Sequence, residues 1–257
     1  MTIPRGLSHV PRHLLEEVLG AIENGRIECP LTELDLHDIG VGTGAASAIA
    51  ESIAGFDRRG ATTILRLVLA ERVHRPPPRL DLVWSGPEAR GTTSRDTALV
   101  LQRMFESAER SVLVAGYTFD SPAILEPLHR RMKERGVRTT MFVNIEAGAT
   151  SAAEGEAHAR RTIDRFLFDV WTFGPPRPNV YYDPRTAMKG PPWVSMHAKC
   201  VVVDEARTLV TSANFTERAQ ERNIEVGVLI EDAGMSADLV AQWRLLIAAG
   251  VVKAYGG

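Results

Sequence analysis

From residue 80 onwards, short apolar runs of strand length alternate with amphipathic segments of helix length. Runs typical of buried strands cover residues 80–84, 111–119, 137–145, 179–182, 194–203, 208–211 and 224–230. Segments with helical periodicity cover residues 96–109, 123–135, 152–171 and 237–249. Alternation of this kind is typical of α/β proteins. The pattern therefore predicts an α/β fold in which a mixed sheet is flanked by helices.

The first 75 residues follow a different pattern. Residues 11–74 have helical periodicity, interrupted by glycines at positions 40, 42, 44, 55 and 60. Three consecutive prolines, at positions 76–78, then remove backbone donors and favour an extended spacer. We therefore expect a small N-terminal helical region at residues 1–75, a proline-containing linker at 76–83 and a second domain at 84–257.

Composition excludes several classes of protein. No stretch approaches the roughly 20 apolar residues of a membrane span, and the first 20 residues lack the apolar block of a signal peptide. The two cysteines, Cys29 and Cys200, give no disulfide framework and cannot build a four-cysteine zinc site. We therefore expect a cytoplasmic protein with no membrane association.

The charge distribution bears on nucleic-acid binding. The net charge of −2 argues mildly against a protein that holds nucleic acid by bulk electrostatics. The charge is unevenly spread, however: residues 1–57 have a net charge of −6, whereas residues 58–95 have a net charge of +5. A local basic stretch can still meet a polyanion, so the balance weakens the case for nucleic acid without excluding it.

One segment, residues 195–225, contains a dense group of polar residues. Its sequence, SMHAKCVVVDEARTLVTSANFTERAQERNIE, holds the candidate site residues His197, Lys199, Asp204, Ser212, Asn214 and Glu225. Because side chains alternate along a strand, His197 and Lys199 are expected to project from one face and Cys200 from the opposite, core-facing side. Ser212 and Asn214 follow the next strand, where a hydroxyl and an amide can approach the same anion.

These residue types suit phosphoryl chemistry. A neutral imidazole is a competent nucleophile towards phosphorus, and a protonated one is a competent acid towards a leaving oxygen. The Lys199 ammonium, with Ser212 and Asn214, would bind the oxygens of the transferring phosphoryl group. Glu225 is the expected orienter of the imidazole, by the logic of a catalytic triad. Asp204 is a candidate catalytic residue by its place in the motif, but holding the turn or Lys199 is the alternative. None of these roles needs a metal, and we expect no cofactor.

The spacing His-x-Lys-x4-Asp, followed by Thr-Ser-x-Asn and then Asn-x-Glu, resembles the signature of the phospholipase D superfamily. The one departure is Thr211, where the superfamily has glycine. The resemblance spans roughly residues 84–250 and implies a phospholipase D-like catalytic domain there, with His197 and Lys199 in its site. The helical leader, the segment VWSGPEARGTTSRDT and the chain length also resemble the phospholipase D-like component of bacterial DISARM anti-phage systems.

This resemblance implies a nuclease whose partner is nucleic acid, with DNA expected in preference to RNA, and whose further partners are other DISARM components. The superfamily's site usually needs two such motifs, and this chain has one. Superfamily members with one motif form a two-fold dimer, so the resemblance implies a homodimer in which each His197 faces its symmetry mate. A phospholipase or phosphatidyl transferase remains an alternative, as does a binding or scaffolding subunit whose helical leader docks onto proteins.

Overall fold

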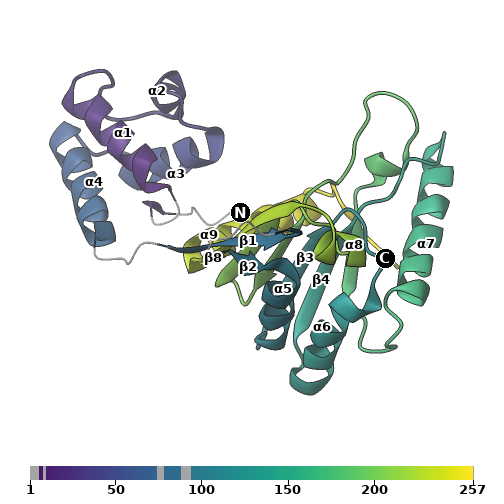
Figure 1. The fold of residues 1–257 in the computed structure, drawn as a ribbon. Coiled ribbons are helices and arrows are strands. Elements are labelled where there is room, and N and C mark those ends of the chain that lie inside the picture. Colours follow the sequence, from purple (N-terminus) through teal and green to yellow (C-terminus); the bar gives the residue numbers. More distant parts are fainter. Residues whose placement is uncertain (1–5, 8–9, 74–77, 88–93, 257) are drawn as a thin grey trace. The chain divides into compact units, whose positions relative to one another are not determined.

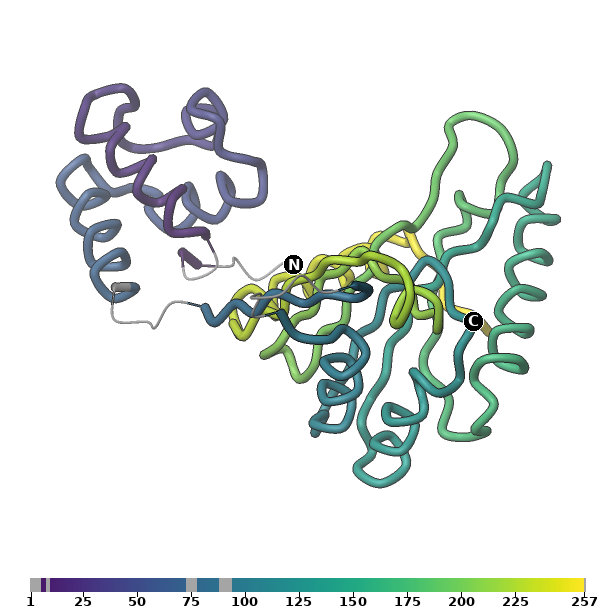
Figure 2. The backbone as a smooth tube through the Cα atoms, in the orientation of Figure 1, coloured from purple at the N-terminus to yellow at the C-terminus, as the bar shows by residue number. Residues whose placement is uncertain are grey.

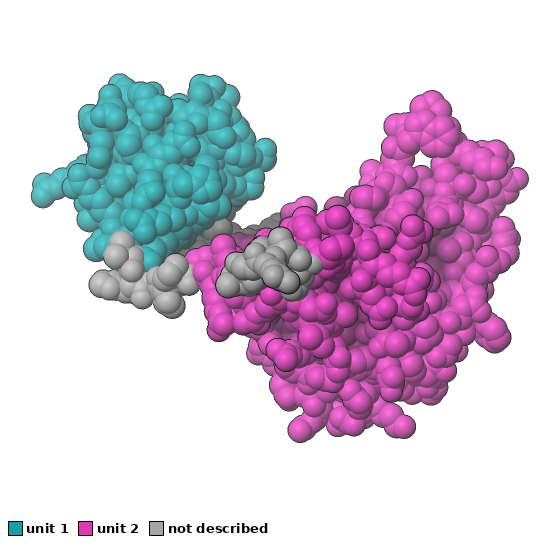
Figure 3. All heavy atoms as spheres, in the orientation of Figure 1, with its two compact units in different colours: residues 1–77 teal, residues 78–257 magenta. Residues whose placement is uncertain are grey.

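The computed structural model of the chain describes residues 6–7, 10–73, 78–87 and 94–256. The chain divides into two compact units, residues 1–77 and 78–257 (Figure 3). The first two residues of the expected linker, 76–83, belong to the segment 74–77, which lies outside the described residues. Strand β1 (Arg79–Ser85) occupies most of the rest of that range, because it pairs along its whole length with β8 (Glu225–Glu231).

The described part of the first unit is helical, as its sequence pattern indicates. Its helices are α1 (Arg12–Glu23), α2 (Glu33–Asp38), α3 (Thr43–Ile53) and α4 (Arg58–Val73). Apolar residues at helical spacing turn inwards to form a separate small core, in which Leu15, Ile22 and Ile49 are fully buried. The Thr32 side chain caps α2 and Asp35 returns the contact, which fixes where this short helix begins.

The second unit is built on one mixed sheet. After β1 come β2 (Arg95–Asp96), α5 (Thr97–Glu106), β3 (Ser111–Gly116), α6 (Pro122–Arg135), β4 (Arg138–Val143), α7 (Ala152–Asp169), β5 (Asn179–Tyr182), the 3-10 helix η2 (Pro184–Ala187), β6 (Cys200–Val203), β7 (Arg207–Thr211), α8 (Glu217–Glu221), β8, α9 (Ala233–Ala248) and β9 (Lys253–Ala254). In the described residues the strand order is β2-β1-β8-β7-β6-β3-β4-β5-β9. Strands β3, β4 and β5 run parallel, whereas β6, β7 and β8 are antiparallel to their neighbours.

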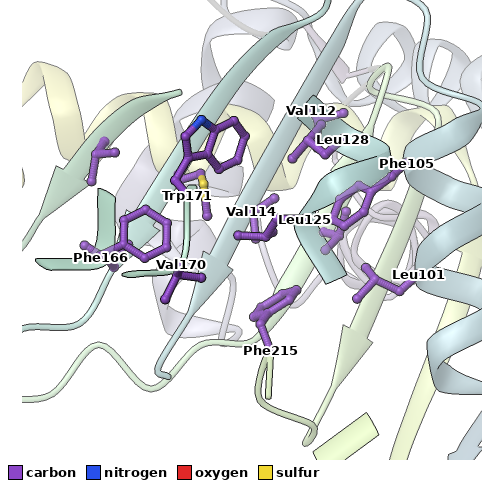
Figure 4. Packing of buried hydrophobic residues seen from close by; sticks show 14 of the residues in the cluster. Leu101, Phe105, Val112, Val114, Leu125, Leu128, Phe166, Val170, Trp171 and Phe215 are labelled. Carbon is purple, nitrogen blue, oxygen red and sulfur yellow. The ribbon is translucent and has the colours of Figure 1, made fainter. Parts of the chain in front are cut away.

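Helices cover both faces of this sheet, so the predicted mixed α/β fold is confirmed (Figure 1). Helices α5, α6 and α7 pack on one face, where Phe105, Leu125 and Trp171 meet alternate strand residues such as Val114 (Figure 4). Helix α9 packs on the other face, where Trp243 meets residues one position out of phase, such as Leu113, Cys200 and Val202. The two-residue period of the strands therefore sorts their side chains into two cores.

One predicted strand is shorter than expected. Residues 194–203 were expected to form a strand, but β6 begins only at Cys200. The neighbouring strands β3 and β7 end at Gly116 and Thr211, so residues 194–198 have no strand to pair with. Instead the Met196 N–H donates to the side-chain oxygen Oδ1 of Asn144 at 2.9 Å. Figure 2 traces the resulting loop, residues 188–199, as the chain approaches β6.

Candidate active site

Three neighbouring strands bring most of the candidate residues to one edge of the sheet. Strand β6 begins at this edge, β7 ends there and β8 begins there, because the strands are antiparallel. The pairing continues one step beyond β6, where the Thr211 N–H donates to the Lys199 carbonyl at 3.1 Å. Across the next pair, the Ser212 N–H donates to the Val226 carbonyl at 2.9 Å. Residues that are distant in sequence therefore share one end of the sheet.

The Lys199 ammonium lies against His197. Its Nζ is 3.3 Å from Nδ1 and 3.4 Å from Nε2 of the imidazole, and it donates to the His197 carbonyl at 3.1 Å. His197 is exposed, whereas only 7% of Lys199 is. Burial lowers the pKa of the Lys199 ammonium, and the negative charge of Glu225 partly offsets that effect. An imidazole open to a substrate thus stands beside a cation that the fold has largely removed from water.

Tyr117, directly after β3, completes the surroundings of this pair. The ring centroids of Tyr117 and His197 are 4.9 Å apart, and Lys199 Nζ is 5.6 Å from the Tyr117 centroid, within the range of a cation–π contact. Tyr117 lies inside the apolar run 111–119, which predicted a buried strand and no role in the site. The signal that would have located it is its position at the end of a central strand, beside the start of β6.

Ser212 and Glu225 form a hydrogen-bonded pair next to the lysine. Ser212 Oγ donates to Glu225 Oε2 at 2.5 Å and accepts from the Val226 N–H at 3.1 Å. The other carboxylate oxygen of Glu225 accepts from the Asn223 side chain at 3.2 Å. In this arrangement the Glu225 carboxylate accepts the hydrogen bond of the Ser212 hydroxyl. The expected roles, in which Glu225 orients His197 and Ser212 binds phosphate, remain predictions.

Asn214 follows Ser212 at the same edge and is half-buried. Its side-chain oxygen Oδ1 is buried and has no hydrogen-bond partner among the described residues. The Gln220 side chain donates to its backbone carbonyl at 2.8 Å and so fixes the backbone of this loop. A buried oxygen without a partner costs free energy, which is a feature that functional sites often retain.

Thr211, where the superfamily signature has glycine, faces a glycine on the next strand. Thr211 is paired with Gly227 of β8. A Cβ atom added at Gly227 would lie 2.9 Å from the Thr211 Cβ and 2.8 Å from the Val210 carbonyl oxygen. Gly227 therefore supplies the space that the Thr211 side chain needs, and the departure from the signature fits the fold.

Asp204 lies at the other end of β6. It is separated from Lys199 by about 16 Å, at about 3.3 Å per strand residue, so the structure does not bring it to the candidate site. Its carboxylate accepts from the backbone N–H groups of Glu109, Arg110 and Ser111 at 2.9, 2.7 and 2.8 Å. Burial raises the pKa of the Asp204 carboxyl, but these hydrogen bonds outweigh that effect and the pKa lies below its ordinary value. In this geometry Asp204 anchors the β6–β7 turn to the start of β3, which favours the structural alternative; its expected catalytic role remains a prediction.

The group formed by His197, Lys199, Ser212, Asn214 and Glu225 combines an accessible imidazole with a fixed positive charge and hydrogen-bonding side chains. The imidazole can attack an electrophile or donate a proton, and the ammonium can stabilise negative charge on nearby oxygens. The described residues hold no group of three or more His, Cys, Asp or Glu side chains arranged to bind a metal ion. None of the helices in the described ranges has the length and apolar composition needed to cross a bilayer.

A family model described as cardiolipin synthase, PLD-like domain, matches residues 101–245. The match covers more than half of the 257 residues, and the chain belongs to this phospholipase D-like family. The DISARM protein DrmC of Bacillus paralicheniformis is 26% identical over 152 residues, which are 59% of this chain and 56% of that protein. The chain thus spans about half the length of this curated relative. Both predicted resemblances, to the superfamily and to a DISARM component, are confirmed.

Solved structures with a similar fold include the phospholipase D family member Nuc from Salmonella typhimurium, with 20% identity and a TM-score of 0.45. NucT from Helicobacter pylori has 19% identity and a TM-score of 0.48. Both matches cover 70% of this chain and 99% of the other. Phosphatidylserine synthase from Haemophilus influenzae has 15% identity and a TM-score of 0.47, over 79% of this chain and 48% of the other.

Proposed function

We propose that the chain is a phosphodiesterase that cleaves nucleic acid, with DNA preferred to RNA and with His197 as its nucleophile. The observation that carries this proposal is the contact between the exposed His197 imidazole and the buried Lys199 ammonium, 3.3 Å apart at the sheet edge. The nucleophile, the acid and the positive charge are all side chains, so the reaction needs no metal. Membership of a phospholipase D-like family supports the same chemistry.

The reaction has two steps. A ring nitrogen of His197 attacks phosphorus, the P–O bond to the leaving oxygen breaks, and a second, protonated imidazole donates its proton to that oxygen. The product is a phosphohistidine. A water molecule then gives its proton to the second imidazole and attacks phosphorus, which breaks the P–N bond and restores His197. Lys199 stabilises the negative oxygens in both steps.

The second imidazole comes from a second copy of the chain, which makes a homodimer with one shared site. An apolar strip next to the site supports this proposal. Leu80, Leu82, Val210, Val226 and Val228 share one sheet face across β1, β8 and β7, and they are between 36% and 61% exposed. Val210 is paired with Cys200, so the strip lies on the sheet face opposite Lys199. Its end at Val226 is next to Glu225 in sequence, so a copy bound around this edge of the sheet would approach the site. Exposed apolar patches of this kind are common at protein interfaces.

For the biological setting, we propose anti-phage defence in the bacterial cytoplasm, with other DISARM components as partners. The support is the 26% identity to a DISARM protein, over about half of that protein's length.

The test incubates the full chain with labelled single- and double-stranded DNA and RNA in excess EDTA, and separately with phosphatidylglycerol vesicles. A His197→Ala variant is compared with His13→Ala, a matched change at an exposed histidine of the first unit. We expect the parent and His13→Ala to cut nucleic acid and His197→Ala to lose the activity. Equal cutting by His197→Ala would show that His197 is not the nucleophile, and turnover of lipid alone would replace the nuclease proposal with phosphatidyl transfer.

The dimer has its own test. A Leu82→Glu change puts a charge into the apolar strip, and Leu34→Glu puts one on an exposed leucine of the first unit. We expect light scattering to show a dimer for the parent and for Leu34→Glu, and a folded, inactive monomer for Leu82→Glu. A parent that is a monomer and nevertheless cuts would refute the shared site.

A further inference from the structure

A cleft of about 450 Å³ opens beside the candidate active site. The ends of β3 and β4 and one side of α7 line it. Tyr117 belongs both to the lining of the cleft and to the surroundings of His197, since the two rings are 4.9 Å apart. A substrate whose phosphate lay at His197 and Lys199 would therefore place a neighbouring group in the cleft.

The charge of the cleft differs from that of the site. Asp120, Glu146 and Asp169 line the cleft, and Arg165 is the one arginine or lysine among the described lining residues. Three carboxylates against one guanidinium disfavour a further phosphate. The occupant of the cleft is therefore a part of the substrate other than a second phosphate, next to the phosphate that Lys199 attracts.

The floor of the cleft is aromatic. Phe119, which is half-buried, stacks on Phe215 with centroids 4.8 Å apart and meets the edge of Phe166 at 5.5 Å. Phe119, Phe166 and Tyr117 all line the cleft. Aromatic side chains stack on flat ring systems, and every nucleobase offers such a π face.

The Asn144 side chain offers a ligand in the cleft a hydrogen-bond donor. Only 9% of it is exposed, and it lines the cleft at the end of β4. Its Oδ1 accepts from the Met196 N–H at 2.9 Å, which identifies the other side-chain atom as the Nδ2 donor. The hydrogen bond found for this side chain among the described residues uses Oδ1, and Nδ2 is not one of the buried atoms left without a partner. A ligand that satisfies it must offer an acceptor, while the carboxylates at the rim require donors.

We propose that this cleft binds the nucleobase next to the scissile phosphate, with preference for bases that carry an exocyclic amino group. Such a base offers a flat ring to the aromatic floor, a ring nitrogen or carbonyl to Asn144 Nδ2, and amino hydrogens to a rim carboxylate. An ammonium headgroup would satisfy the carboxylates but would leave the Asn144 donor without an acceptor. The inference deepens the proposed nuclease function, on which it rests, by naming the part of the substrate that the cleft recognises.

The test measures nucleoside binding to the full chain by calorimetry, with cytidine and uridine as probes. Cytidine has an amino group and an accepting ring nitrogen where uridine has a carbonyl and a ring N–H. Nucleosides carry no phosphate, so this readout does not depend on nuclease activity. The main variant is Asn144→Asp, because aspartate keeps the acceptor for the Met196 N–H and loses the donor, while it adds one negative charge. Asn179→Asp, at an exposed position in β5, is the matched control. Asp169→Asn, at an exposed rim position, tests the carboxylates without a buried change.

We expect the parent and Asn179→Asp to bind cytidine more tightly than uridine. We expect Asn144→Asp to weaken cytidine binding about tenfold, the effect of one lost hydrogen bond in a partly buried site. Asp169→Asn should narrow the difference between cytidine and uridine. Absence of saturable nucleoside binding to the parent, or equal affinity of the parent and Asn144→Asp, would overturn the proposal. Cytidine binding by a protein that cuts no nucleic acid would support the cleft and contradict the nuclease function separately.

Discussion

Replacing Asp204 by asparagine separates a structural role from a catalytic one. Asp204 Oδ1 accepts from the backbone N–H groups of Arg110 and Ser111, and Oδ2 accepts from that of Glu109. Asparagine can keep the first two bonds through its single oxygen, while its NH₂ group would face the Glu109 N–H, donor against donor. The backbone at Asp204 has a φ of 55°, which asparagine tolerates well. The substitution therefore removes one hydrogen bond to a charged group and makes the other two neutral, without straining the turn.

The expected loss follows from that bond. A hydrogen bond to a charged group contributes about 1.5–3 kcal/mol, and the partial exposure of Asp204 places this one near the lower part of that range, at about 2 kcal/mol. For a unit of this size, each kcal/mol lowers the melting temperature by about 2–4 °C, so we expect a decrease of roughly 4–8 °C. The Asp204→Ala change removes all three bonds and adds backbone strain, so its decrease should be larger.

The assay pairs thermal unfolding, followed by circular dichroism, with cleavage of bis(p-nitrophenyl) phosphate per folded molecule at a temperature below both transitions. We expect Asp204→Asn to melt earlier and to keep the cleavage rate of the parent, because Asp204 lies about 16 Å from Lys199 by strand geometry. An unchanged melting temperature would refute the anchoring argument. A normal melting temperature with cleavage reduced a hundredfold would return Asp204 to the reaction.

Three further predictions concern Asp204, Lys199 and Cys200. The difference in free energy of unfolding between the parent and Asp204→Asn should shrink in acid. The pKa of Asp204 is lower in the folded chain than in the unfolded chain, so the carboxylate stabilises the fold above the unfolded pKa, and this contribution is lost as the pH falls through the folded pKa. Unfolding in urea from pH 7 to pH 2 measures the difference. Lys199→Met should reduce cleavage by about 10²–10³-fold without lowering the melting temperature. It should also remove a rise in stability just below pH 10.5, where the unfolded chain binds the Lys199 proton more tightly than the buried site does. Cleavage rates and melting temperatures, measured for both proteins across this pH range, check both parts. Burial raises the pKa of Cys200 from 9.0 to about 11, so at pH 8 its thiolate fraction falls about a hundredfold and iodoacetamide should label Cys29 before Cys200, as peptide mass spectrometry would show.

Periodicity was sufficient to predict the main strands and helices of the second unit, but not the short elements β2, η2, α8 and β9. The alternation that assigns Cys200 to the core opposite Lys199 is a local property of the chain, and the structure places Cys200 under α9 as expected. Strand ends were less predictable, because they depend on where neighbouring strands stop. Residues 194–198 are apolar enough for a strand but have no partner, and that fact depends on Gly116 and Thr211, which are distant in sequence.

The candidate site was predictable to the same extent. His197, Lys199, Ser212, Asn214 and Glu225 occur within 29 residues of each other, so their spacing alone pointed to one location. Tyr117 and Asn144 were not found, because they reach the site from β3 and β4 through a parallel pair whose register no short motif encodes. Asp204 was placed in the motif by spacing alone, whereas its three backbone partners belong to the segment before β3.

The loop before β6 has a consequence for how this chain tolerates changes in length. His197 precedes the start of β6 by three residues, and the Asn144 contact at Met196 holds its neighbour. The start of β6 and the Asn144 contact therefore fix the position of His197, which does not depend on the path of the chain between β5 and Met196. An inserted segment near Pro191 and Pro192, both exposed, would lengthen the loop without moving the imidazole. A single residue inserted between His197 and Lys199 would separate the imidazole from its lysine, so this stretch is where the chain should accept no change in length.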